Sequence, residues 1–137
     1  MSMLNRKYDL EERLINFGVA MIQISENLPK SFAGNHLSCQ LTRSVTAPAL
    51  HFGEALSEEP RNDFIHKMKV ALKELRETNI CLKIINKINW FTDEILAVRL
   101  KECNELISIF VTSITTAQRN KQAKYLLHYS KFPVQFS

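Results

Sequence analysis

The stretch from residue 61 to residue 88, RNDFIHKMKVALKELRETNICLKIINKI, decides the fold. Its apolar positions recur at alternating steps of four and three residues, which is the repeat of a helix that packs along one seam. The seam consists of Phe64, Met68, Ala71, Leu75, Thr78, Leu82 and Ile85. The stretch therefore predicts one long amphipathic helix over 61–88.

Three further segments carry helical spacing. Asp9 followed by Glu12 matches a capping box and predicts a first helix from about residue 9 to 27, which ends at Leu28-Pro29. A second helix is expected from about 35 to 56. A fourth is expected to begin after Thr92, which can cap it, and to fray near residues 119–121.

Four long segments with short links predict an all-α fold, an antiparallel up-down-up-down four-helix bundle. The chain has 137 residues, enough for one domain, and only 3 glycines and 4 prolines, which argues against an all-β fold. We expect the bundle to occupy residues 1–121. Residues 122–137 are expected to form a basic aromatic C-terminal tail.

Pro48 lies inside the second predicted helix. A proline in a helix interior costs about 3 kcal/mol, because it removes one backbone hydrogen bond and clashes with the preceding turn. Ala47, Ala49 and Gly53 are small and would let a neighbouring helix approach closely. The sequence favours one helix kinked near Pro48, and the alternative is two shorter helices with a break near Ala47.

Arg43 and Glu54 share a face of that helix but lie about 16 Å apart along its axis, so they cannot pair with each other. If the hairpin between the second and third helices is centred near residue 57 or 58, Arg43 lies level with Glu74, or with Glu77 one turn away. The same geometry places Glu54 near Arg61. Such directional ion pairs would fix the register of the two helices more than they add stability.

Apolar residues are more plentiful than one buried stripe per helix requires. The surplus on the third and fourth helices consists of Ile65, Val70, Leu72, Ile80, Ile84, Ile88, Ile107, Ile109, Phe110 and Val111. A second buried face on each helix predicts self-association. A shared surface that does not close as a two-fold would give a ring.

Positive charge is concentrated in two places. The formal net charge is +4, and the excess lies in the last 21 residues, which carry four Lys or Arg and no acid. Candidate nucleic-acid contacts are Lys69, Lys73, Arg76, Lys83 and Lys87 on one stripe of the third helix, with Arg119, Lys121 and Lys124 near the C-terminus. The stripe could hold a phosphate backbone without reading bases. The alternative is a solvated face and a tail whose aromatics pack on the bundle.

Several chemistries find no support in the sequence. Cys39, Cys81 and Cys103 form no CxxC pair, which indicates free thiols and a reducing, cytoplasmic location. No apolar run is long enough to span a membrane. His51 and Glu54 are one turn apart, but no Glu-x-x-His occurs, so we expect no metal site, no cofactor and no catalytic residues.

Two blocks of the chain resemble a known family. Residues 41–55, LTRSVTAPALHFGEA, and residues 57–85, SEEPRNDFIHKMKVALKELRETNICLKII, are similar to four-helix bundle proteins linked to intervening sequences of bacterial 23S ribosomal RNA. The resemblance covers roughly residues 8–118, with His51 standing where the family often has asparagine. The matching positions are Arg43, Glu54, Asp63, Phe64, Lys67, Ala71, Glu74, Glu77 and Thr78.

The resemblance implies an antiparallel four-helix bundle that assembles as a homopentameric ring. A related branch serves as the accessory protein of diversity-generating retroelements, where a basic pentamer engages nucleic acid and a reverse transcriptase. By that analogy we expect a non-catalytic chain whose partners are its own copies and RNA or DNA. The alternative hypothesis is a protein-interaction scaffold that binds a partner protein and no nucleic acid.

Overall fold

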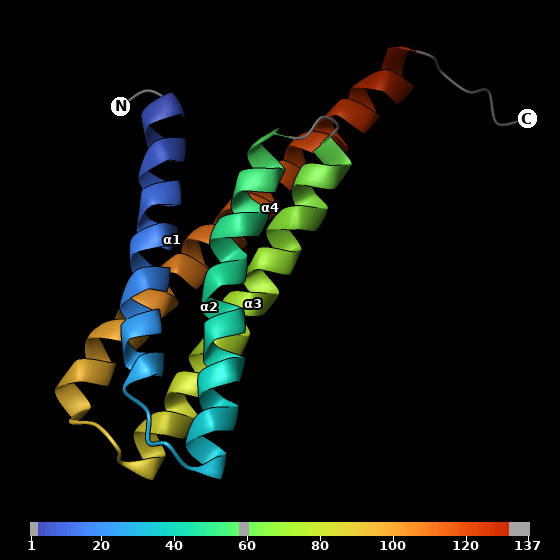
Figure 1. Ribbon diagram of the computed structural model, residues 1–137. Coiled ribbons are helices and arrows are strands. Elements are labelled where there is room, and N and C mark those ends of the chain that lie inside the picture. The colour runs from blue at the N-terminus through green and yellow to red at the C-terminus, as the bar shows by residue number, and fades with distance from the viewer. Residues whose placement is uncertain (1–2, 58–60, 132–137) are drawn as a thin grey trace, which may run out of the picture.

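The computed structural model describes residues 3–57 and 61–131, with side chains over 9–57 and 63–122. All of the described regular structure is helical: α1 (Met3–Glu26), α2 (Phe32–Ser57), α3 (Arg61–Ile88) and α4 (Asp93–Lys131). Successive helices run in opposite directions, and α4 crosses obliquely behind the other three (Figure 1). The predicted antiparallel four-helix bundle is confirmed.

The core lies where the predicted seam of α3 meets the other helices. Every seam residue is buried except Phe64, which is partly buried. Phe52 of α2 and Phe110 of α4 meet edge to face in this core, with ring centroids 6.0 Å apart. Its other large, fully buried side chains are Leu14, Phe17, Met21, Leu41, Val45, Leu96 and Leu106. The heptad pattern thus identified the central helix of the core.

The connection between α1 and α2 is closed by a serine cap. The Gly34 backbone N–H donates to Ser31 Oγ at 3.1 Å, which satisfies one of the free donors at the start of α2. A side chain at Gly34 would overlap the Pro29 carbonyl oxygen, so only glycine fits there. This cap starts α2 at Phe32, three residues before the predicted position.

The predicted outer ends of the first and last helices were wrong. Helix α1 begins at Met3, so Asp9 lies inside the helix and does not cap it. Helix α4 continues to Lys131, through the predicted fraying point and through the predicted boundary between residues 121 and 122. No glycine or proline interrupts either extension. The side chains of the predicted tail lie outside the described residues, apart from that of residue 122.

Helix α2 is continuous through Pro48, so the alternative of two shorter helices is wrong. Pro48 is buried, which puts its ring into the packing that offsets its missing hydrogen bond. A methyl group added at Gly18 of α1 would lie 3.0 Å from the Val45 carbonyl oxygen. Helices α1 and α2 therefore approach closely one turn before the proline.

Candidate nucleic-acid interface

The five cations of the α3 stripe are all exposed on the side of the helix opposite the buried seam. The stripe runs through Lys69, Lys73, Arg76, Lys83 and Lys87, with one gap of seven residues. Ile80 fills that gap, so an isoleucine stands in the middle of the row of cations. The stripe is thus a mixed basic and apolar surface.

A shallow groove of about 1060 Å³ runs along the outer surface of α3 between α2 and α4. Lys69, Lys73 and Arg76 line it, and Leu72, Ile80 and Ile84 give it an apolar floor. The groove therefore brings together three of the five predicted stripe cations. Lys83 and Lys87 are exposed further along α3 and do not line it.

The predicted C-terminal cations extend the basic surface at one end of the bundle. Arg119 and Lys121 are exposed on α4, and the side chain of Lys124 lies outside the described residues. Helix α4 runs antiparallel to α3, and Thr115 lines the same groove as Lys69. Arg119 and Lys121 follow Thr115 by about one and two turns, towards the end where α3 begins.

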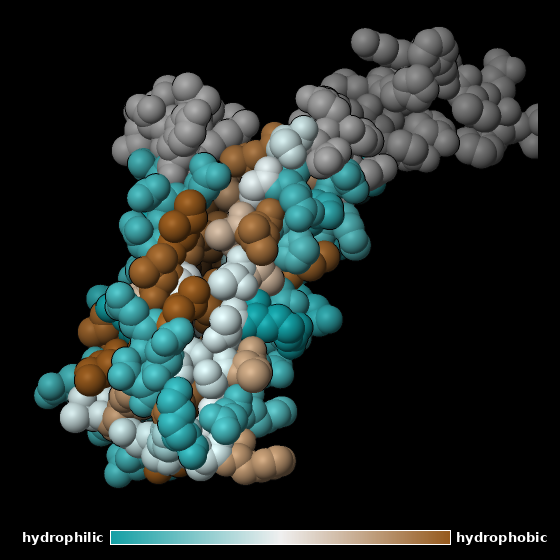
Figure 2. Space-filling view, in the orientation of Figure 1, coloured by the Kyte–Doolittle hydropathy of each residue, from teal (hydrophilic) through white to brown (hydrophobic). Residues whose placement is uncertain are grey.

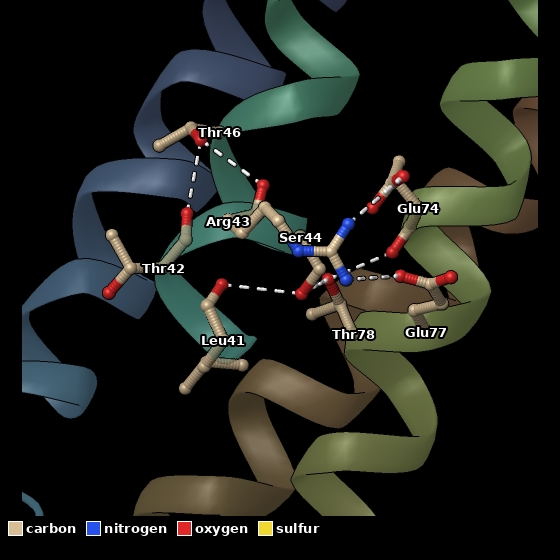
Figure 3. A network of polar contacts seen from close by, with 8 residues as sticks. All are labelled: Leu41, Thr42, Arg43, Ser44, Thr46, Glu74, Glu77 and Thr78. Carbon is tan, nitrogen blue, oxygen red and sulfur yellow. Dashed lines mark hydrogen bonds and ion pairs between the residues drawn. The ribbon is translucent and has the colours of Figure 1, made fainter. Parts of the chain in front are cut away.

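A polar network links α2 to α3 beside this groove (Figure 3). Arg43 Nη2 donates to Glu77 Oε2 at 3.4 Å, and Arg43 Nη1 lies 3.9 Å from Glu74 Oε1. In the layer beneath, Thr78 Oγ1 lies 2.9 Å from Ser44 Oγ. The structure thus places Arg43 between the two carboxylates that hairpin geometry had suggested.

Glu74 is the most unusual ionisable group of this network. Burial raises the pKa of its carboxyl group, and the neighbouring charge of Glu77 raises it further, while Arg43 and Lys73 act in the opposite direction. Its Oε2 atom is buried and has no hydrogen-bond partner. Because Arg43 is more than half exposed, water screens much of the charge that it offers.

Glu54 has a different partner from the predicted one. Lys67 Nζ donates to Glu54 Oε2 at 2.5 Å and lowers the pKa of that carboxyl group, and His51 Nδ1 lies 3.9 Å away. The side chain of Arg61 lies outside the described residues. The partners of Arg43 and Glu54 centre the hairpin about two or three residues beyond the assumed position, which moves the residue opposite Glu54 by more than one turn.

Sequence reasoning missed the ion pairs that join the first helix to the last. Arg13 donates to Glu102 at 2.9 Å and to Glu105 at 3.0 Å, and these bonds raise the pKa of the guanidinium. No hairpin connects α1 directly to α4, so sequence spacing gave no register for this pair. The two glutamates stand three residues apart on one face of α4, which was the one available signal.

The surplus apolar residues divide into two groups. Ile65 and Phe110 are buried within one chain, so part of the surplus needs no second copy. Ile80, Ile84 and Ile88 are 55%, 46% and 42% exposed on the outer surface of α3. These three remain exposed beside the cations.

Other kinds of site are absent from the part of the chain that the structure describes. Over residues 3–57 and 61–131 no helix is long and apolar enough to cross a membrane. Within the same ranges no three His, Cys, Asp or Glu side chains gather as metal ligands do. Cys39 is exposed, whereas burial raises the pKa of Cys81 and raises that of Cys103 to about 11.

Comparisons with known proteins agree with this architecture. The family model of the 23S rRNA-intervening sequence protein matches residues 6–112. A protein of unknown function from the S23 ribosomal protein family of Bacteroides thetaiotaomicron VPI-5482 has a similar solved structure. Its TM-score is 0.73 at 24% sequence identity, over 80% of this chain and 97% of that one. No curated protein matches the chain.

Proposed function

The chain belongs to the 23S rRNA-intervening sequence protein family, and on that premise we propose that it is a non-catalytic bundle that assembles with its own copies into a ring and binds nucleic acid weakly. The ring is a pentamer, as the family resemblance implies. The observation that carries the nucleic-acid proposal is the row of exposed cations on α3, three of which line one groove.

The groove suits contact with a phosphate backbone better than recognition of bases. Lysine and arginine attract phosphates regardless of sequence, and release of counterions makes such binding weaken as salt increases. The lining residues include no phenylalanine, tyrosine or tryptophan on which a base could stack. Binding is therefore expected to be weak, salt-sensitive and nearly independent of base sequence.

Ring assembly multiplies this weak contact. Each copy adds a groove, and a strand that tracks around the ring meets several of them at a high effective concentration. Arg119 and Lys121 add exposed charge at the end of the bundle where α3 begins. The proposal therefore joins the two functions: assembly supplies the number of sites, and each α3 groove supplies a modest affinity.

Retention of a labelled single-stranded RNA on immobilised protein at 0.05 and 0.3 M salt tests the proposal. Because α4 continues to Lys131, truncation after residue 116 would remove part of a helix. Arg119→Gln/Lys121→Gln/Lys124→Gln is a cleaner variant. We expect retention at low salt, loss at high salt and weaker retention by the variant. An absence of salt-sensitive binding by the wild-type protein would reject the nucleic-acid role.

A second candidate is a ring that presents its surface to a partner protein. The exposed isoleucines of α3 favour it, because apolar side chains contribute little to phosphate binding and much to protein interfaces. Co-purification of a partner that survives nuclease treatment would favour the scaffold. Loss of every partner on nuclease treatment would favour nucleic acid.

A further inference from the structure

Helix α3 carries a second heptad row on its outer surface. Its steps are four, three and four, through Arg76, Ile80, Lys83 and Lys87, with Ile84 beside Lys83. We name these five residues the α3 outer seam. They are all exposed, and the seam spans about 16 Å at 1.5 Å per residue. A heptad row on a helix surface has the spacing of a seam that packs against another helix.

Helix α1 carries a row of the same spacing and the opposite charge. Its steps are three, four, three and four through Glu12, Ile15, Val19, Ile22 and Glu26, which we name the α1 outer seam. Ile15 and Val19 are 43% and 51% exposed. The seam spans about 21 Å, so it is long enough to cover the α3 outer seam.

Ion pairs within the chain leave each outer seam with a single sign of charge. The one described cation of α1 is Arg13, and it is turned towards α4, where it bonds to Glu102 and Glu105. The acids of the neighbouring stretch of α3, Glu74 and Glu77, are likewise turned towards Arg43 of α2. The α1 outer seam is thus acidic and apolar, and the α3 outer seam is basic and apolar.

The two seams cannot satisfy each other within one chain. Among the described residues α1 packs on α2 and α4 and makes no contact with α3. Figure 2 shows the separation on one face, with apolar surface gathered over α1, a pale band over α2 and hydrophilic surface towards α3. A second copy of the chain offers each seam a complementary surface.

We propose that the α1 outer seam of one copy packs against the α3 outer seam of the next. The inference rests on the proposed self-assembly and names its interface. Because the two surfaces differ, the contact is head-to-tail, and contacts of this type close into a ring or grow into a filament. The isoleucines and Val19 form the apolar centre, and Glu12 and Glu26 meet Lys83, Lys87 and Arg76 at the edges.

This interface divides the work of the α3 stripe. Lys83 and Lys87 belong to the contact between copies, at the end of α3 furthest from the groove cations. Lys69 and Lys73 remain on the groove, available to phosphate. The stripe therefore serves both parts of the proposed function with different residues, and substitution can separate them.

A charge swap tests the interface by sedimentation velocity over a range of protein concentrations, with helicity from circular dichroism as the check on folding. Lys83→Glu/Lys87→Glu and Glu12→Lys/Glu26→Lys are each expected to weaken assembly about tenfold or more, because like charges then face each other. The variant that combines all four changes is expected to assemble within a few-fold of the wild type.

The control is Lys69→Glu/Lys73→Glu, which is expected to keep the wild-type mass and lose RNA retention. Ile84→Ser adds a test without charge, and it is expected to weaken assembly as well. Folded charge-reversal variants that keep the wild-type mass, or a combined swap that fails to restore it, would overturn the interface alone. A wild-type protein that sediments as a single chain would overturn self-assembly itself.

Discussion

Replacing Lys69 and Lys73 by glutamine should weaken RNA binding by an amount that the structure fixes. Both ammonium groups line the α3 groove, so a strand lying in it contacts at least two fewer phosphates per chain engaged. Each phosphate contact with a single strand contributes about 0.7 to the slope of log affinity against log salt. The double variant should therefore lower that slope by about 1.4 and weaken binding roughly 25-fold at 0.1 M salt.

Fluorescence anisotropy of a labelled single-stranded RNA from 0.05 to 0.3 M salt measures both quantities. The matched control is Lys30→Gln/Lys101→Gln, which removes the same charge at two exposed positions outside the groove. We expect the control to keep nearly the wild-type slope. An equal loss in both variants would show that only net charge matters, and no loss in the groove variant would refute the placement of the site.

Three further predictions concern the bundle that presents this surface. Glu74→Gln should remove a penalty that grows with pH: the raised pKa of Glu74 gives stability that is present below its ordinary value of 4.5 and lost as pH rises through the folded value, so urea unfolding should favour the variant increasingly from pH 4.5 to 7. A flat difference over that range would contradict this cause. Gly53→Ala should be neutral or stabilise α2 by up to about 1 kcal/mol, because nothing lies within 4 Å of the added methyl group, whereas Gly34→Ala should destabilise strongly. Equal melting temperatures for the two variants would sink that argument. Phe110→Ala should cost about 3–5 kcal/mol in unfolding free energy, since the ring is fully buried, and a loss below 1 kcal/mol would mean that the core is packed differently.

The central helix and its core could be predicted because heptad spacing depends only on positions within one segment. The seam from Phe64 to Ile85 is the core side of α3, and the helix runs from Arg61 to Ile88 as predicted. The outer ends of α1 and α4 could not be placed, because a cap such as Asp9 signals where a helix can start and not where it must. Good helix formers beyond it let the helix extend.

Pairing between helices was predictable only as far as the hairpin register. Arg43 tolerated the error because Glu74 and Glu77 stand one turn apart and both lie within reach. Glu54 did not, because its assumed partner at residue 61 and its actual partner Lys67 lie on different turns. The contacts of Arg13 had no hairpin to predict them, although they leave the α1 outer seam acidic.

The mass of the purified protein in solution tests the central claim most directly, since both the ring and the proposed interface require copies to associate. Light scattering at micromolar concentration and moderate salt should give five times the 15.8 kDa of one chain. A particle of 15.8 kDa under those conditions would contradict the account, because the exposed isoleucines of α3 would then have no partner copy to cover them.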